Sequence, residues 1–356
     1  MNKTRKSSII NEIMQYPIIT ILFLILVLYF FLNVESDLIN LQDVQINIRH
    51  TSPFLFIVIG QALVMRMGGF DLSVGAILSA SAVIFASFNA GDMNSWLALG
   101  IAMILCVLIG ATNGLLVAIC KSYLPSTKSK WIGFFRQILP SIIVTLISMH
   151  VIRRGLSAIF GTSTFSLHDT TTESFQRFFS ESVFFEASAA IWIPYLLLIM
   201  LCIFFNKFRI GKRNGLLGYN GDEQQSKKEL LTKTLIVYIF SALCAGFAGI
   251  LIAMRSFAGV FLLIGSTYEW GRISIAIVLI SGICIFSTRG RIAGLVFGIL
   301  TWATLYYGLI VLRAPPREAQ IIIRSIMFIL ISINILQSVI ITRFISKHEC
   351  KEIPKP

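Results

Sequence analysis

Charged residues are scarce in this sequence. Asp, Glu, Lys and Arg make up 13% of its 356 residues, whereas a soluble domain carries about 25%, so a globular surface of this size could not be covered with ionised groups. Hydrophobic residues make up 56% of the chain, or about 199 side chains, and a transmembrane helix takes about 20 of them. The composition therefore excludes a soluble enzyme, a disordered chain and a nucleic-acid-binding domain, and it predicts a helical protein with roughly ten membrane spans.

Signatures of catalysis and of metal binding are also missing. The six cysteines and four histidines show neither a CxxC pair nor a Cys/His ligand spacing, which argues against a metal site and against a disulfide framework. The chain contains no P-loop, no Gly-x-Ser-x-Gly elbow and no His-Glu-x-x-His pair. The apolar runs hold few ionisable groups, which disfavours a proton relay. We expect no catalytic residue, metal or bound cofactor, and an energy source on another subunit.

The chain does contain long apolar runs. The first follows a basic N-terminus and lacks a small-residue cleavage site, so we expect a retained span and not a signal peptide. The runs predict ten spans, at residues 16–32, 53–65, 72–88, 96–120, 140–160, 189–205, 235–254, 273–286, 292–311 and 321–341. The second, third and eighth are short or interrupted by glycine, which is typical of broken helices that line a cavity in transporters.

The basic residues gather in alternate loops. The formal net charge is +13, and a membrane protein collects such residues in its cytoplasmic loops. The loop at residues 207–234 is strongly basic, whereas the preceding loop, between the fifth and sixth spans, is acidic. We therefore predict one transmembrane domain over residues 1–356, with both termini and the 207–234 loop in the cytoplasm.

A glycine-rich polar segment separates the second and third spans. It contains Gly68, Gly69, Asp71, Ser73 and Gly75. The glycines permit a sharp turn, and Asp71 is suited to cap a helix that begins at Leu72. The segment is equally typical of an ordinary helix cap and of a broken helix beside a translocation path.

Two further segments stand out. Gly290, Gly294 and Gly298 recur every four residues, which predicts a face where helices pack closely. Residues 218–231 are polar and cytoplasmic, and composition alone favours a solvated loop there. That stretch includes Gly218, Asn220, Asp222, Glu223, Gln224 and Gln225.

Five blocks, taken in order, resemble the membrane permeases of bacterial ATP-binding cassette (ABC) importers for ribose, galactose, xylose and autoinducer-2, in the branched-chain amino acid/ribose permease superfamily. The blocks are Gly-Gly-Phe-Asp-Leu-Ser-Val-Gly at 68–75, Asn-Gly-Leu-Leu-Val-Ala at 113–118, the Pro…Ile-Val-Thr-Leu…Met…Arg-Gly pattern at 140–155, Gly-Tyr-Asn-Gly-Asp-Glu at 218–223, and Gly-Arg-x-x-Gly-x-x-x-Gly at 290–298.

The resemblance implies an all-α permease of the type II ABC importer kind in the inner (plasma) membrane of a bacterium. It implies a cytoplasmic ABC ATPase that holds the ATP and Mg, a periplasmic solute-binding protein, and a second permease that is either another copy or a paralogue. Residues 218–231 then match the family's coupling helix, which docks on the ATPase. The solute implied is small, most simply a sugar.

The sequence departs from the family pattern in two places. Gln224 and Gln225 stand where small residues are usual, and residues 121–137 look like a basic, aromatic insertion that suits the anionic lipid surface.

Alternative functions stay open at this point, and nucleoside uptake by the same kind of importer is the main one. A secondary transporter that works without an ATPase, and more distantly an intramembrane enzyme, are alternatives from other classes.

Overall fold

Apart from an isolated bridge between Phe184 and Ala187, the regular structure in the described part of the chain is α-helical. The computed structural model describes residues 17–34, 41–123, 130–161, 165, 167, 171–184, 187–207, 227–256, 261–283 and 292–349. These contain α2 (Ile18–Val34), α3 (Leu41–Arg66), α4 (Val74–Ala90), α5 (Ser95–Tyr123), α6 (Lys130–Phe160), α7 (Glu173–Ser180), α8 (Ala189–Lys207), α9 (Lys227–Ser256), α10 (Phe261–Ile280), α11 (Gly294–Val311) and α12 (Pro316–Glu349).

Most of these helices are apolar enough to lie in a membrane. Within the described residues, six helices contain a segment that is long and apolar enough to cross a membrane. These are α3, α5, α6, α9, α11 and α12. α2, α4 and α8 contain shorter apolar segments. Every predicted span overlaps one helix, so the all-helical, multi-pass fold class is confirmed.

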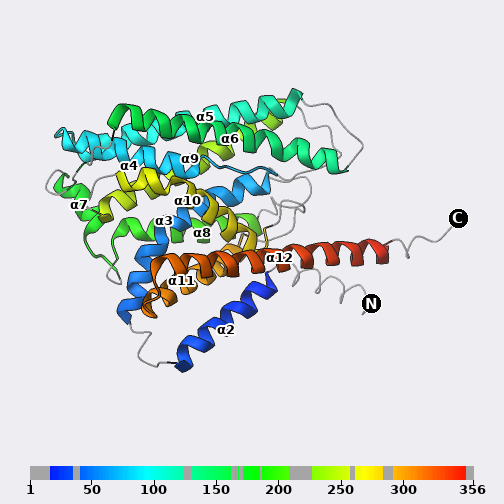
Figure 1. Ribbon diagram of the computed structural model, residues 1–356. Helices are drawn as coiled ribbons and strands as arrows, with labels where there is room; N and C mark the ends of the chain where they lie inside the picture. The colour runs from blue at the N-terminus through cyan, green and yellow to red at the C-terminus, as the bar shows by residue number, and fades with distance from the viewer. Residues whose placement is uncertain are drawn as a thin grey trace. The chain divides into compact units, whose positions relative to one another are not determined.

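Residues 40–275 form one compact unit, in which α3 and α9 are central. α9 packs against α3, α4 and α5, while α6 covers α4 and α5, and α8 covers α3 (Figure 1). The membrane-length segment of α3 is 78% buried, whereas that of α6 is 22% buried. Apolar side chains on the outer helices, such as Ile104 and Leu108 of α5 and Val151 of α6, are exposed, as expected for surfaces that face lipid.

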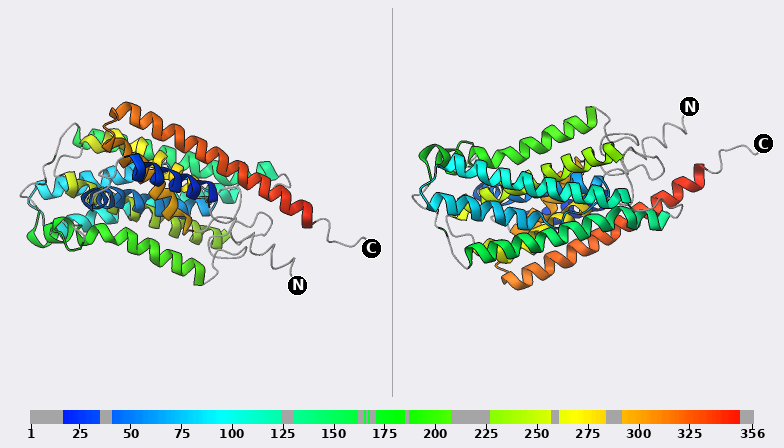
Figure 2. Two further views of the ribbon diagram at one scale, coloured as in Figure 1. Left: turned by 90° about the horizontal axis from the view of Figure 1, so that it is seen from below. Right: turned by 90° about the horizontal axis from the view of Figure 1, so that it is seen from above.

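Residues 1–39 and 276–356 form the second unit. Here α11 packs against α2 and α12, and α12 is one long continuous helix (Figure 2). Polar contacts join distant parts of this unit, because Thr20 Oγ1 donates to the Ile280 carbonyl at 2.7 Å and Asn334 Nδ2 donates to Thr20 Oγ1 at 3.0 Å.

The second span is longer than predicted. The sequence suggested residues 53–65, but α3 begins at Leu41 and runs for 26 residues. Its polar first half is held by contacts with α8: Thr51 Oγ1 and the Tyr195 hydroxyl are 2.6 Å apart, and Ser52 Oγ donates to the Ile191 carbonyl at 2.9 Å. Tertiary hydrogen bonds thus stabilise helix where hydropathy alone indicated loop.

Two other predicted boundaries were wrong. The eighth span was placed at residues 273–286, but α10 occupies Phe261–Ile280, and the chain leaves the helix at Gly282, whose φ of +77° suits glycine. Charged residues in the middle of α10 hid its first half from a hydropathy search. The third span was expected to begin at Leu72, and α4 begins at Val74.

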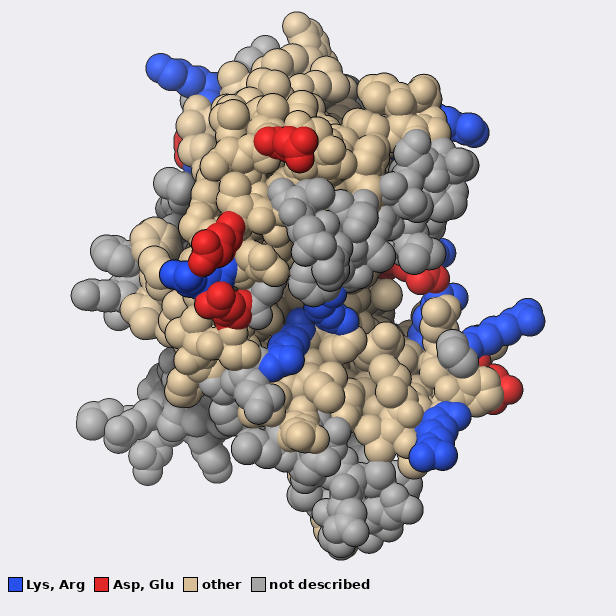
Figure 3. Space-filling model, turned by 90° about the vertical axis from the view of Figure 1, so that its left-hand side faces the viewer, with Lys and Arg blue, Asp and Glu red and all other residues tan. Residues whose placement is uncertain are grey.

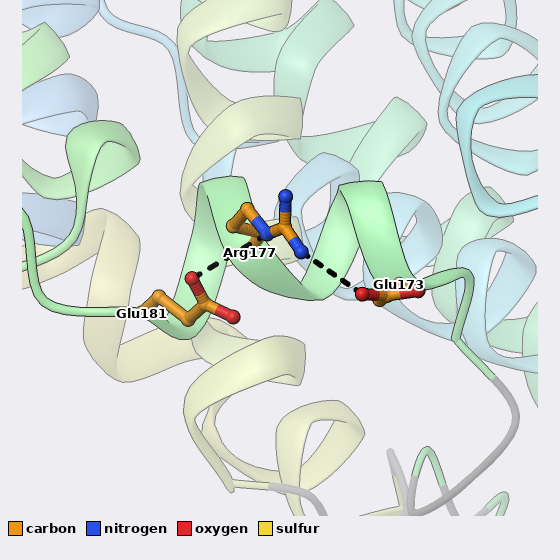
Figure 4. Close-up of polar contacts among 3 residues, drawn as sticks. All are labelled: Glu173, Arg177 and Glu181. Carbon is orange, nitrogen blue, oxygen red and sulfur yellow. Dashed lines mark hydrogen bonds and ion pairs between the residues drawn. The ribbon is translucent and has the colours of Figure 1, made fainter.

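The acidic loop before α8 contains a helix, α7, that the sequence did not predict. Phe175 and Phe179 are buried on its inner side, and Phe175 lies 5.1 Å from the ring of Phe85 and 5.0 Å from that of Trp96. Its outer side carries an exposed ion-pair series, in which Arg177 bonds Glu173 at 2.9 Å and lies 3.6 Å from Glu181 (Figure 4). The view in Figure 3, onto the side where Figure 1 draws α7, shows few charged side chains among uncharged ones.

Candidate functional site

The segment between α3 and α4 is a helix break inside the first compact unit. α3 ends at Arg66, and the chain turns at Gly68, which has a φ of +71°. A Cβ on Gly69 would lie 3.1 Å from Ser141 Oγ and 3.2 Å from the Tyr238 hydroxyl, so a larger residue would be crowded there. Gly68, Gly69, Asp71 and Ser73 are all buried.

A buried non-helical segment must find partners for its backbone polar groups. α6 supplies three of them from one face, since Gln137, Ser141 and Thr145 are spaced four residues apart. Ser141 Oγ accepts from the Phe70 amide at 3.1 Å, and Thr145 Oγ1 accepts from the Leu72 amide at 3.0 Å. Gln137 Nε2 donates to the Met67 carbonyl at 3.2 Å.

The other backbone partners come from α3 and α9. The Tyr238 hydroxyl of α9 donates to the Phe70 carbonyl at 3.4 Å. The Gln61 amide, in the orientation that its neighbours require, donates to the Asp71 carbonyl at 3.0 Å and accepts from the Asp71 amide at 3.3 Å. The break is therefore a defined conformation fixed by side chains of α3, α6 and α9.

Asp71 lies at the centre of this network and is 1% exposed. Its Oδ1 accepts from the Ser73 amide at 3.0 Å and from the Ser73 hydroxyl at 2.5 Å, and its Oδ2 accepts from Ser241 Oγ at 3.1 Å. Asn113 Nδ2 of α5 donates to Ser73 Oγ at 2.9 Å. These partners of the carboxylate are neutral hydroxyl and amide groups, so hydrogen bonds hold it in place.

Asp71 therefore does not cap α4 as expected, because Ser73 holds the N-cap position without a side-chain capping bond, and the amide that Asp71 accepts from is that of Ser73, before the helix begins. Gly75 lies in the first turn of α4, where its carbonyl accepts from Ser79 Oγ at 3.1 Å. Within the described residues no group of three His, Cys, Asp or Glu side chains is placed to hold a metal ion. The network fixes the course of the backbone between α3 and α4 and holds a buried carboxylate in one position.

The sequence pointed to the glycines and to Asp71 and missed the side chains that hold them. Ser141, Thr145, Tyr238 and Ser241 were not among the predicted site residues. The signal for the α6 partners was present, because Gln137, Ser141 and Thr145 are polar residues at a helical spacing of four in an apolar stretch.

Two of the three predicted packing glycines lie at close approaches in the second unit. A Cβ on Gly294 would collide with the Ser281 carbonyl, and one on Gly298 would collide with Ser281 Oγ and lie 2.9 Å from the Ile277 carbonyl. Gly290 lies outside the described residues, as do the predicted coupling residues Gly218, Asn220, Asp222, Glu223, Gln224 and Gln225. Of the 218–231 stretch, residues 227–231 are described and form the start of α9.

Comparisons with known proteins point in one direction. The family model described as "Branched-chain amino acid transport system / permease component" matches residues 47–332. The chain is 29% identical over 344 residues to the D-allose transport system permease protein AlsC of Escherichia coli K12, covering 94% of this chain and 93% of that protein.

Two further relatives carry other sugars in their names. The chain is 26% identical to the ribose import permease protein RbsC of Bacillus subtilis 168, over 77% of this chain and 78% of the relative. It is 23% identical to the galactose/methyl galactoside import permease protein MglC of Salmonella typhimurium LT2, over 95% of this chain and 98% of the relative. No solved structure matches the chain significantly.

Proposed function

We propose that this chain, which belongs to the family of branched-chain amino acid transport system permease components, is the membrane-spanning subunit of a bacterial ABC importer for a sugar. Its curated relatives are named as permeases for D-allose, ribose and galactose or methyl galactoside. These names favour a sugar over a nucleoside, and an importer over a secondary transporter or an intramembrane enzyme.

One structural observation carries the proposal, namely the buried helix break at residues 67–73. Irregular backbone at membrane depth is tolerated where it is buried in protein or lines a water-filled cavity, and transporters build their solute paths from such broken helices. Gly68, Gly69, Asp71, Ser73 and Gly75 then lie beside the translocation path, and the hydrogen bonds to the break keep its shape during transport.

The coupling of transport to ATP hydrolysis follows from the course of α9. The proposed coupling segment, residues 218–231, leads into this helix, which begins at Lys227. The Tyr238 and Ser241 side chains of α9 contact the break, and Tyr238 is about eleven residues, or roughly 16 Å, from the start of the helix. A pull by an ATPase on the coupling segment would move α9 and, through these two side chains, the break.

The proposed importer needs further subunits beside this chain. An ABC ATPase binds ATP and Mg in the cytoplasm, a second permease copy or paralogue completes the channel, and a periplasmic solute-binding protein delivers the sugar. Both termini are cytoplasmic, the chain lies in the inner (plasma) membrane, and it binds no cofactor or metal of its own. The basic segment at residues 121–137 contacts the anionic lipid surface.

Uptake by the reconstituted importer tests the proposal. The chain is co-expressed with its partner ATPase and solute-binding protein, and proteoliposomes are given labelled D-allose, D-ribose, D-galactose and L-leucine. We expect ATP-dependent uptake of at least one sugar. Uptake that persists without the ATPase would make the chain a secondary transporter, and uptake of leucine alone would replace the sugar assignment.

A further inference from the structure

One basic side chain is buried near the end of a membrane helix. Lys121 lies two residues before the end of α5 and is 8% exposed, and it is the only buried lysine or arginine among the described residues. No group in the described part of the chain pairs with its ammonium. A buried charge without a partner is costly, so this position calls for an anion.

Lys121 faces α9 across a close helix contact. A Cβ on Gly110 would lie 2.8 Å from the Tyr238 carbonyl oxygen, and a Cβ on Gly114 would lie 3.2 Å from the Thr234 carbonyl oxygen. The contact thus shifts toward the start of α9 as it shifts toward the end of α5, so the two helices are antiparallel. Lys121 is seven residues, or about two turns, beyond Gly114 on the same side of α5, at the level where α9 begins.

The surrounding helices offer this ammonium no counter-charge. α5 and α6 contain no Asp or Glu, and the only acidic residue of α9 is Glu229. Glu229 Oε1 lies 2.5 Å from Lys233 Nζ in its own helix, so that carboxylate is already paired. An anion that balances Lys121 must therefore come from outside these three helices.

A second polar group lies at the same contact between α5 and α9. Thr234 is 1% exposed, and its Oγ1 has no hydrogen-bond partner in the described structure. Helical side chains lean toward the N-terminus of their own helix. Because the two helices are antiparallel, the side chains of Lys121 and Thr234 lean toward each other, and one anion between them can accept from both.

The outer side of the same part of α5 is suited to face lipid. Leu115, Leu116 and Ile119 are exposed there, and Tyr123, the last residue of the helix, is 82% exposed. Tyrosines are enriched at the level of the lipid headgroups. Lys121 is two residues from Tyr123, or about 3 Å along the helix axis, so it lies close to the layer of lipid phosphates.

We propose that Lys121 and Thr234 bind the phosphate group of an anionic phospholipid between α5 and α9. Basic sites between membrane helices on the cytoplasmic side bind anionic headgroups. This site is distinct from a contact of residues 121–137 with the membrane surface, because Lys121 is turned inward. Its assignment to the cytoplasmic leaflet rests on the topology in the proposed function.

Lipid binding by the purified full-length chain tests the site. Wild type, Lys121→Met and Lys228→Met are titrated with phosphatidylglycerol in detergent, and bound lipid is counted by native mass spectrometry. Lys228 is the matched control, because it is an exposed lysine at the start of α9. We expect the affinity to fall about tenfold or more for Lys121→Met, which loses a hydrogen bond from a charged donor, and to stay unchanged for Lys228→Met. Equal affinities of wild type and Lys121→Met would overturn the inference.

The contribution of the hydroxyl is measured with Thr234→Val, which keeps the shape of the side chain. We expect the affinity for phosphatidylglycerol to fall about threefold, as for the loss of one hydrogen bond from a neutral donor. An unchanged affinity of this variant would contradict a site made of both residues.

Thermal unfolding in nanodiscs distinguishes a lipid from a free phosphate ion. In phosphatidylcholine, Lys121→Met should be at least as stable as the wild type, because an unpaired buried charge has been removed. Phosphatidylglycerol should raise the melting temperature of the wild type but not that of the variant. A lower stability of Lys121→Met in phosphatidylcholine would show that the lysine has a partner within the protein. An equal rise of the wild type with saturating inorganic phosphate in phosphatidylcholine would replace the lipid by a free ion.

These measurements use the permease alone, so they separate this inference from the proposed function. If the complete importer takes up a sugar and Lys121→Met binds phosphatidylglycerol as the wild type does, the lipid site is wrong and the proposed function stands. If no sugar is taken up but Lys121→Met loses the lipid, the proposed function is refuted and the binding site stands.

Discussion

The hydroxyl of Ser241, in the middle of α9, donates a hydrogen bond to the carboxylate of Asp71, 170 residues earlier in the chain, at 3.1 Å. Both residues are buried, at 0% and 1% exposure. The bond joins the helix that follows the proposed coupling segment to the break that we place beside the solute path. It is the shortest polar connection between α9 and the break among the described residues.

Replacement of Ser241 by alanine should destabilise the protein by about 1–3 kcal/mol, because a buried carboxylate oxygen loses its donor. The measurement is thermal or denaturant unfolding in detergent. Thr112→Ala is the matched control, since its hydroxyl donates only to Leu108 within an exposed stretch of α5, and it should change stability by less than about 0.5 kcal/mol. Equal losses of stability for the two substitutions would show that the Asp71–Ser241 bond does not stabilise the fold.

Gly294→Ala should lower the folded yield and the melting temperature in detergent, and Gly294→Leu should lower them further. The new Cβ meets the Ser281 carbonyl, a backbone atom that cannot rotate away. Gly100→Ala is the control, because no atom lies within 4 Å of its added Cβ, and alanine there should stabilise the helix by about 0.5–1 kcal/mol. Unchanged stability of Gly294→Leu would mean that this glycine faces lipid.

Simultaneous replacement of Asp222 and Glu223 by lysine should abolish uptake and weaken binding to the ATPase. Two acidic residues near a helix start favour that helix through its dipole, and the reversed charges oppose it. The readouts are stimulated ATP hydrolysis and pull-down of the ATPase, with Glu318→Lys at the exposed start of α12 as the control. Normal pull-down and full activity of the double variant would mean that residues 218–231 do not dock on the ATPase and are solvated, as composition alone suggested.

Reporter fusions should place Lys130 and Lys212 in the cytoplasm and Thr172 outside. The basic residues of the 207–234 loop and the acidic residues around α7 set this orientation through the positive-inside rule. An alkaline phosphatase reporter is active outside and a fluorescent protein inside, so the two fusions at each site check one another. An external Lys212 would contradict both the ten-span topology and the coupling assignment.

Hydropathy predicted the apolar helices well and the polar ones poorly. The fourth span, predicted at residues 96–120, is α5, Ser95–Tyr123, because its lipid-facing side makes the whole run apolar. The first half of α3 was missed, since Gln45, Thr51 and Ser52 look like loop residues until the contacts with α8 are known. α10 was shifted for the same reason, with Glu269 and Arg272 in its middle.

The residues of the candidate site were also predicted only in part. Gly68, Gly69, Asp71 and Ser73 could be found because a local turn and a cap leave a local pattern in the sequence. Their partners could not be paired with them, because Ser141, Tyr238 and Ser241 come from helices 71 to 170 residues away. Which polar side chain reaches which backbone atom depends on how the helices pack, and that packing has no local signature.

The distance in sequence between the break and its partners also sets an order of events during synthesis. At about 5–20 residues per second, the ribosome makes the 170 residues between Asp71 and Ser241 in roughly 10–30 s. During that interval α3 and α4 already exist, while the hydroxyls of α9 do not. The polar turn between them must then stay hydrated, in the insertion machinery or at the membrane surface. The helical hairpin α3–α4 is therefore completed only when α6 and α9 arrive, which makes it a late step in the biogenesis of this permease.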